Sequence, residues 1–206
     1  MIILIKTGPY NPLKPGLNKY QSYSLITLQK YDPPLDKTQI NNYLKNTKKD
    51  LAKVDYLLTS NLKRATQTSQ FLKTNHLIKR EVKIKKTPHL NEIKFSMAKL
   101  CSQQEYGRYK SVIVRRCFIS AFIANTLMES HQDIQKRFTL LEEQIAKLQL
   151  NYQNIACISH TFFIKLYSVY KKHPELFEHP KIIRKYLNPK KKIMNFCDIK
   201  RIQNLP

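Results

Sequence analysis

The chain opens with an apolar run that ends abruptly. Residues Ile2–Ile5 are apolar and mostly β-branched, and the break Lys6-Thr7-Gly8-Pro9 follows them. A short apolar run closed by Gly and Pro is typical of a buried parallel strand that ends in a loop. Ligands of open α/β sheets bind at the carboxyl ends of such strands. The tip Lys6–Gly8 is therefore a candidate for a functional site.

Three later segments also indicate strands. Val54–Thr59 is a short apolar run that ends at Ser60-Asn61, and Asn154–Ser159 is another that ends at His160. Both have the length and the side chains of buried strands. A last strand is expected near Met194–Cys197, in the tail of the chain.

Helical patterns lie between these predicted strands. After the break at Asp32–Leu35, Asp36 or Thr38 is a candidate N-cap for a helix. The apolar side of that helix would consist of Ile40, Tyr43, Leu44 and Leu51. A second helix, Leu62–Thr74, follows with Ser60-Asn61 as its expected N-cap.

The second half of the chain is richer in helical patterns. Residues 97–150 form a helix-rich region, and Thr161–Tyr170 predicts a buried helix after the strand that ends at His160. Within the helix-rich region, apolar residues recur every three or four positions, which places them on one face of a helix. These residues are Ile134, Phe138, Leu141, Ile145 and Leu148.

The order of these elements predicts an α/β fold. Strands that alternate with helices favour a three-layer sandwich, in which a mostly parallel central sheet carries helices on both faces. A chain of 206 residues suits one domain. We therefore expect a single domain, 1–206, with a helical insert at about 97–150.

Composition narrows the candidate ligands. The three glycines are too few and too scattered for a Gly-rich phosphate loop of the Walker or dinucleotide type. The formal charge of +23 favours nucleic acid, anionic surfaces or phosphorylated ligands as partners. However, 29 of the 37 basic residues are Lys, spread along the whole chain, so compositional drift in an A/T-rich genome explains the charge equally well.

Neither a metal site nor a membrane span is indicated. The four cysteines are Cys101, Cys117, Cys157 and Cys197, which form no C-x-x-C pair, so buried reduced thiols are expected and no metal or cofactor. The first strand follows Met1 without a signal-peptide pattern, and the longest weakly charged run, 117–128, is too short for a membrane span. We expect a cytoplasmic protein; the sequence does not indicate its oligomeric state.

Several segments resemble, in order, the motifs of one family. Residues 60–68, SNLKRATQT, resemble the S-x-L-x-R-A-x-Q-T signature of the histidine phosphatase superfamily, the phosphoglycerate-mutase-like proteins. Further resemblances are Asp32–Leu44 to its D-x-P-L-(S/T) turn and helix, Leu90–Phe95 to L-x-E-x-x-F/W, Glu129–Arg137 to E-S-x-x-D-x-x-x-R, and Ile158–Thr161 to the strand end V-x-H-G. Together they cover nearly the whole chain.

The resemblance implies a phosphate site at the strand ends. In the family, the first strand ends in Arg-His-Gly, and this His attacks phosphorus and is transiently phosphorylated. By position, Arg64 at the start of a helix and His160 would hold the phosphate group. Glu92 would donate the proton to the leaving group. Lys6 and Gly8 stand at the family's first Arg and Gly and are expected to contact phosphate as well.

The chain departs from the family pattern at the residues that attack and bind phosphate. It has Lys6-Thr7-Gly8 in place of Arg-His-Gly, and Thr161 in place of the Gly that follows the second His. The hydroxyl of Thr7 is a poor nucleophile without a positioned base. Lys6 keeps a positive charge but lacks the planar fork that binds two phosphate oxygens. The pattern is that of a pseudoenzyme.

Three hypotheses remain open. In the first, the protein is non-catalytic or weakly active and binds phosphate, a phosphorylated small molecule or an anionic partner at a cationic rim of Lys6, Arg64 and His160. In the second, it is an active phosphomonoesterase in which Thr7, with His160 as base, or His160 itself attacks phosphorus. In the third, lysine patches at 83–86 and 190–192 bind nucleic acid or an anionic surface.

Overall fold

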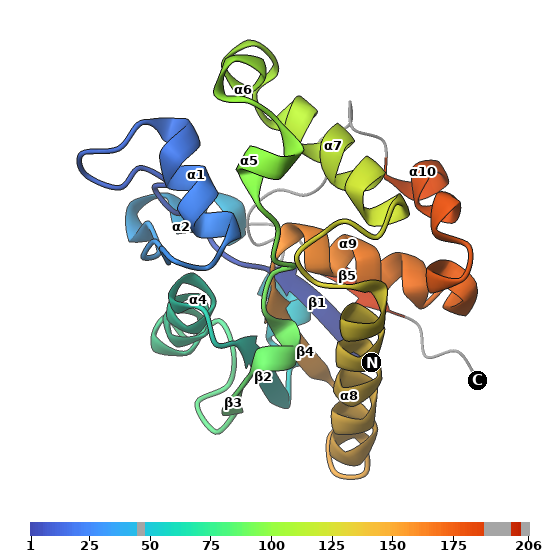
Figure 1. The fold of residues 1–206 in the computed structure, drawn as a ribbon. Helices are drawn as coiled ribbons and strands as arrows, with labels where there is room; N and C mark the ends of the chain where they lie inside the picture. Colours follow the sequence, from blue (N-terminus) through green and yellow to red (C-terminus); the bar gives the residue numbers. More distant parts are fainter. Residues whose placement is uncertain (45–47, 188–198, 203–206) are drawn as a thin grey trace.

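The fold is built on one mixed β-sheet. The computed structural model describes residues 1–44, 48–187 and 199–202. The strands are β1 (Ile2–Lys6), β2 (Tyr56–Ser60), β3 (Lys83–Thr87), β4 (Ile155–Ser159) and β5 (Ile199–Ile202). They lie in the order β3-β2-β4-β1-β5. The first four are parallel, and β5 pairs antiparallel with β1 (Figure 1).

Helices connect the strands and surround the sheet. The α-helices are α1 (Lys19–Thr27), α2 (Lys37–Leu44), α3 (Lys48–Leu51), α4 (Lys63–Thr74), α5 (Met97–Leu100), α6 (Gln103–Tyr109), α7 (Ser111–Ile123), α8 (His131–Gln149), α9 (Thr161–Tyr170) and α10 (Ile183–Tyr186). Short 3₁₀ helices are η1 (Pro88–Leu90), η2 (Pro174–Phe177) and η3 (Pro180–Ile182).

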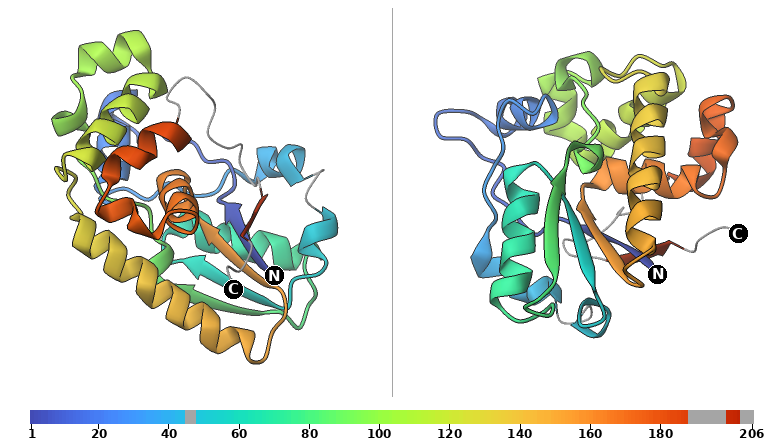
Figure 2. Two further views of the ribbon diagram at one scale, coloured as in Figure 1. Left: turned by 90° about the vertical axis from the view of Figure 1, so that its right-hand side faces the viewer. Right: turned by 90° about the horizontal axis from the view of Figure 1, so that it is seen from below.

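Two hydrophobic clusters cover the two faces of the sheet. Because successive strand side chains point to opposite faces, Ile3 and Ile5 of β1 pack with α2, α3 and α4, whereas Ile2 and Leu4 pack with α7, α8 and α9. Figure 2 shows the sheet between α4 and α8 in its right-hand view. The predicted three-layer α/β architecture is confirmed.

The helix-rich region divides into two parts. Helix α8 runs along the sheet and buries Ile134, Phe138, Leu141 and Ile145 of its predicted apolar face, while Leu148 is half-buried. Helices α5, α6 and α7 instead lie beyond the carboxyl ends of the strands (Figure 1). The part of the expected insert that reaches the candidate site is therefore α5–α7.

The start of α4 differs from the prediction. The N-cap is Leu62, which has no capping side chain, and Ser60 is the last residue of β2 rather than a helix cap. The N–H of Lys63 donates instead to the carboxylate of Asp32, from the loop before α2. The expected cap of α2 is confirmed at Asp36, whose Oδ1 accepts the N–H of Thr38 at 3.1 Å.

Several elements were not predicted, among them β3 and α1, and parts of two predictions lie outside the described residues. Strand β3 and helix α1 lack a clear apolar pattern; α1 begins with a capping box between Asn18 and Gln21. The expected strand at Met194–Cys197 and the side chain of Tyr43 lie outside the described residues. In the described part of the chain, no helix combines the length and the apolar character that a membrane span requires.

Candidate functional site

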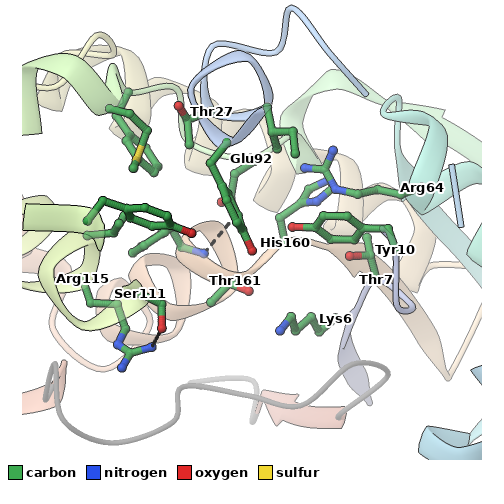
Figure 3. Close-up of a pocket in the computed structure, with 17 residues that line it drawn as sticks. Lys6, Thr7, Tyr10, Thr27, Arg64, Glu92, Ser111, Arg115, His160 and Thr161 are labelled. Carbon is green, nitrogen blue, oxygen red and sulfur yellow. Dashed lines mark hydrogen bonds between the residues drawn. The ribbon is translucent and has the colours of Figure 1, made fainter. Parts of the chain in front are cut away.

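A cavity of about 310 Å³ lies at the carboxyl ends of β1 and β4. Its polar side is formed by Lys6, Thr7, Arg64, Glu92, His160 and Thr161, which come from four separate segments of the chain. Figure 3 shows these side chains around one space. The structure therefore brings together five of the six predicted site residues; the sixth, Gly8, does not belong to the described lining of the cavity.

Arg64 is fixed at the start of α4 by contacts on two sides. Its Nη1 donates to Oδ1 of Asp32 at 2.9 Å, and the ring of Tyr10 lies 5.3 Å from Cζ of the guanidinium. Only 3% of the Arg64 side chain is exposed. A guanidinium held rigidly at the N-terminal end of a helix is favourable for an anion, because the helix dipole and the charge act in the same direction.

His160 is buried and joined to the end of β2. Its Nε2 lies 2.9 Å from Oγ of Ser60, which in turn lies 2.7 Å from Oδ1 of Asn91. The same Oδ1 accepts the backbone N–H of Asn61, so the Ser60 hydroxyl donates to Asn91 and accepts from His160. This network places the imidazole proton on Nε2 and leaves a lone pair on Nδ1.

The surroundings of His160 keep its imidazole neutral. Burial lowers the pKa of His160 well below the ordinary 6.5, and the positive charges of Arg64, Arg137 and Lys6 lower it further. The expectation that His160 contributes a positive charge to a cationic rim is wrong at neutral pH. His160 is instead a neutral hydrogen-bonding group.

Lys6 and Thr7 end β1 at the edge of the cavity. The side chain of Thr7 is 1% exposed, and its backbone N–H donates to the carbonyl of Ser159 at 2.9 Å, which extends the β1–β4 pairing. Figure 3 shows the side chains of Lys6 and Thr7 among those that surround the cavity. The Thr7 hydroxyl therefore lies at the end of the first strand; its equivalence to the first histidine of the family stays a prediction.

Gly8 packs against α4 rather than lining the cavity. Its N–H donates to Oγ1 of Thr68 at 3.0 Å. A Cβ at this position would lie 2.5 Å from Cδ1 of Leu35, which is closer than real atoms approach. The structure thus gives Gly8 a packing role, and its expected contact with phosphate stays a prediction.

Glu92 caps α9 while facing the cavity. Its Oε1 accepts the N–H of Phe163 at 2.8 Å, and its Oε2 accepts that of Phe162 at 3.3 Å. Burial raises the pKa of the Glu92 carboxyl, while these hydrogen bonds and the charge of Arg64 oppose the rise. A raised pKa suits a proton donor, so that role stays a prediction for a group that also holds a helix end.

The residues of the motif at 129–137 lie outside the described cavity lining and contact one another. Nη2 of Arg137 lies 2.9 Å from Oε2 of Glu129, with both side chains largely buried. Ser130 and Asp133 form the capping box that starts α8. The residues of this motif therefore stabilise the start of α8. In addition, the positive charge of Arg137 lowers the pKa of His160.

The outer wall of the cavity was not predicted from the sequence. Ser111 and Arg115 of α7 belong to it, and Nη1 of Arg115 donates to Oγ of Ser111 at 3.2 Å. Tyr10, Tyr23 and Tyr106 line it as well. No motif marks these positions, because which face of α1 or α7 meets the cavity depends on the packing of the helices.

The described residues hold no group of three or more His, Cys, Asp or Glu side chains placed to bind a metal ion. Cys101, Cys117 and Cys157 are free thiols, and Cys197 lies outside the described residues.

A family model matches most of the chain, but not the segment Lys6–Gly8. The family model described as histidine phosphatase superfamily (branch 1) matches residues 26–182. Curated protein sequences gave no match.

Solved structures share the fold at low sequence identity. A phosphoserine phosphatase from Entamoeba histolytica, a histidine-to-alanine mutant in complex with phosphoserine, aligns with a TM-score of 0.55 and 18% identity over 96% of this chain and 87% of that one. A mycobacterial glucosyl-3-phosphoglycerate phosphatase in complex with VO3 has a TM-score of 0.61 and 16% identity over 96% and 88%. The α-ribazole phosphatase from Shigella flexneri has a TM-score of 0.57 and 19% identity over 86% and 83%.

Proposed function

The chain belongs to the histidine phosphatase superfamily, and from this we infer that it binds phosphate or a phosphorylated small molecule in the strand-end cavity with little or no catalysis. The observation that carries the proposal is the position of Thr7. Its side chain ends β1 in the same cavity as Arg64 and His160, where a phosphatase of this family needs an imidazole.

The charges of the cavity favour an anion. Among the described lining residues, the charged side chains are Lys6, Arg64, Arg115 and Glu92. Three positive charges against one carboxylate give a net positive site, and His160 adds a neutral imidazole with a lone pair on Nδ1. A monoprotonated phosphate can donate to such a nitrogen while the cations contact its other oxygens.

Loss of the attacking group is compatible with binding in this fold. One structural neighbour, the Entamoeba phosphoserine phosphatase, holds phosphoserine although a histidine has been replaced by alanine. A threonine hydroxyl has a pKa far above neutral and attacks only with an adjacent base. The cavity of this chain therefore supports recognition of a phosphate group better than its transfer.

The test compares the wild type with the Lys6→Arg/Thr7→His double variant. Titration calorimetry with inorganic phosphate at low salt is expected to show binding to both proteins. Hydrolysis of 4-nitrophenyl phosphate is expected from the double variant alone. Absence of phosphate binding by the wild type at low salt would refute the proposal, and so would efficient turnover by the wild type.

A matched pair of lysine variants tests whether the anion binds in the cavity. Lys6→Gln removes a cation that lines it, whereas Lys63→Gln removes an exposed cation that lies outside the described lining. Phosphate affinity is expected to fall for the first variant and to stay unchanged for the second. Equal losses would indicate unspecific attraction by the overall charge.

One observation favours residual phosphatase activity as a second candidate. His160 is neutral, and its unprotonated Nδ1 is the form of imidazole that can attack phosphorus. Acid-labile phosphoprotein that disappears in His160→Gln would support this route. Acid-stable phosphoprotein that disappears in Thr7→Ala would instead identify Thr7 as the nucleophile.

The remaining expectations rest on the sequence alone. Lys83, Lys85 and Lys86 are exposed on the edge strand β3, outside the described cavity lining, and residues 190–192 lie outside the described part of the chain. The neighbours named above are phosphatases, so binding of nucleic acid gains no support from them. A cytoplasmic location stays a prediction.

A further inference from the structure

The cavity is larger than a phosphate group requires. The predicted phosphate contacts lie on its polar side, at the ends of β1 and β4. The rest of its wall comes from α1, from the α5–α7 region and from the start of α9. A cavity of about 310 Å³ accommodates a small organic molecule attached to the phosphate. The chemistry of this outer wall therefore indicates what that molecule is.

The outer wall is mainly apolar and aromatic. Its side chains include Ile26, Tyr23, Phe95, Met97, Tyr106 and Val114. The rings are arranged in contact with one another: Tyr23 and Tyr106 have centroids 5.9 Å apart, and Phe95 and Phe162 lie edge to face at 5.3 Å. Such a wall gains free energy by covering a flat apolar group. The hydroxyl groups of Tyr23, Tyr106 and Thr27 also belong to this wall, so hydrogen bonds to a ligand are possible beside the apolar contacts.

Besides the phosphate contacts and the aromatic wall, the cavity has another cationic group, Arg115. Arg115 of α7 lines the cavity, and its guanidinium donates to Oγ of Ser111. Figure 3 shows this pair on the opposite side of the cavity from Arg64 and Thr7. A ligand that reaches from Arg64 across the aromatic wall thus ends beside a second cation. A carboxylate is complementary to a guanidinium that is accompanied by a hydroxyl.

We infer that the ligand is a phosphate ester of a small aryl alcohol that carries a carboxylate at the opposite end of the ring. The phosphate lies at Arg64, Lys6 and His160, the ring lies against Tyr23, Tyr106 and Phe95, and the carboxylate contacts Arg115. This inference rests on the proposed function, because the phosphate site fixes one end of the ligand. It adds Arg115 as the residue that determines specificity for the other end.

The experiment measures four ligands by titration calorimetry: inorganic phosphate, methyl phosphate, phenyl phosphate and 4-carboxyphenyl phosphate. Phenyl phosphate is expected to bind about tenfold more tightly than methyl phosphate, because the ring removes more of the apolar wall from water than a methyl group does. The carboxylate is expected to add about another fivefold in the wild-type protein, the size of a partly exposed ion pair.

Two variants of adjacent arginines identify the contact. Arg115→Gln is expected to remove the preference for 4-carboxyphenyl phosphate over phenyl phosphate, measured as the ratio of the two affinities in the same variant. Arg116→Gln removes the same charge from an exposed position of α7 outside the described lining and is expected to keep the preference. Because both variants are compared through a ratio of two ligands, a small change in stability does not affect the result.

The possible results distinguish failure of the proposed function from failure of the inferred ligand. If inorganic phosphate and all three esters fail to bind, the proposed function is wrong and the inference falls with it. If phosphate binds but phenyl phosphate is no better than methyl phosphate, the aryl ligand is wrong while the phosphate site stands. If the preference for the carboxylate is absent, or is lost equally in Arg115→Gln and Arg116→Gln, Arg115 does not receive it and the inference is overturned.

Discussion

Nε2 of His160 lies 2.9 Å from Oγ of Ser60, and this contact joins the ends of β4 and β2 at the back of the cavity. The two residues are 100 positions apart in the sequence. Ser60 is the first residue of the signature at 60–68, and its hydroxyl determines which imidazole nitrogen carries the proton. The signature therefore sets the chemical state of His160 as well as supplying Arg64.

Removal of the Ser60 hydroxyl is expected to lower stability. Ser60→Ala leaves the buried Nε2–H of His160 and the Oδ1 of Asn91 each with one partner fewer, which costs about 2 kcal/mol. The free energy of unfolding in urea at pH 7.5 measures the loss. Ser69→Ala is the control, because the Ser69 hydroxyl is equally buried but bonds to the carbonyl of Thr66 within α4. A similar loss in both variants would contradict the role given to Ser60.

The Asp32–Arg64 pair is expected to matter more than a surface pair. Asp32→Asn keeps an oxygen for the N–H of Lys63 but removes the negative charge beside a guanidinium that is 3% exposed. We expect the free energy of unfolding to fall by about 2 kcal/mol, less than for a fully buried pair because Asp32 is 25% exposed. Urea denaturation checks the value.

Asp50→Asn is the matched control for that variant. Asp50 pairs with Arg201, whose side chain is 63% exposed, so solvent screens the interaction and the expected loss stays below about 1 kcal/mol. Equal losses for Asp32→Asn and Asp50→Asn would show that Arg64 does not depend on its buried partner.

The buried His160 predicts a dependence of stability on pH. The unfolded chain binds a proton at this side chain below about pH 6.5, whereas the folded protein, in which burial lowers the pKa of His160, stays neutral. The free energy of unfolding should therefore be highest above pH 6.5 and fall as the pH is lowered, by at most about 1.4 kcal/mol per pH unit. Glu92, with its raised pKa, contributes with the opposite sign at lower pH.

The difference between wild type and His160→Gln isolates this contribution. Urea denaturation at pH 8.0, 7.0, 6.0 and 5.5 should give a wild-type curve that falls below pH 6.5 more steeply than that of the variant. His179→Gln replaces an exposed histidine and should reproduce the wild-type curve. Parallel curves for wild type and His160→Gln would mean that His160 titrates alike in the folded and unfolded states.

Much of the fold could be predicted because its central strands are buried on both faces. The cores of β1, β2 and β4 are continuous apolar runs, and such runs are visible in a sequence. Strand β3 was missed because it lies at the edge of the sheet, where Lys83, Lys85 and Lys86 are exposed. Lysines on an edge strand hinder pairing with other chains. They also interrupt the apolar pattern by which a strand is recognised in a sequence.

Those site residues could be predicted that follow a strand closely in the sequence. Thr7 and His160 follow β1 and β4 directly, Arg64 lies in the first turn of α4 just after β2, and parallel strands end at one edge. The cap of α4 was mispredicted because Asp32 supplies it from the loop before α2 rather than from the residues next to the helix. Arg115 was missed because the orientation of α7 is set by tertiary packing, and Arg116 beside it is exposed.

The final prediction concerns two glycines with opposite surroundings. A Cβ at Gly8 would lie 2.5 Å from Cδ1 of Leu35 and 3.0 Å from Cδ1 of Ile40, both buried core side chains. A Cβ at Gly107, in α6, meets nothing within 4 Å. Gly8→Ala is therefore expected to destabilise the protein by about 1–3 kcal/mol through overpacking. Gly107→Ala is expected to stabilise it by up to about 1 kcal/mol, because alanine favours a helix.

Thermal and urea denaturation of the two variants distinguish packing from backbone freedom. The change is the same methyl group in each, so the opposite signs can come only from the surroundings. Because Gly8 follows Thr7 directly, Gly8→Ala should also displace the end of β1 and weaken phosphate binding, whereas Gly107→Ala should not. If Gly8→Ala were as stable as the wild type and bound phosphate equally well, the close packing of Gly8 on Leu35 would not be what positions Thr7 in the cavity.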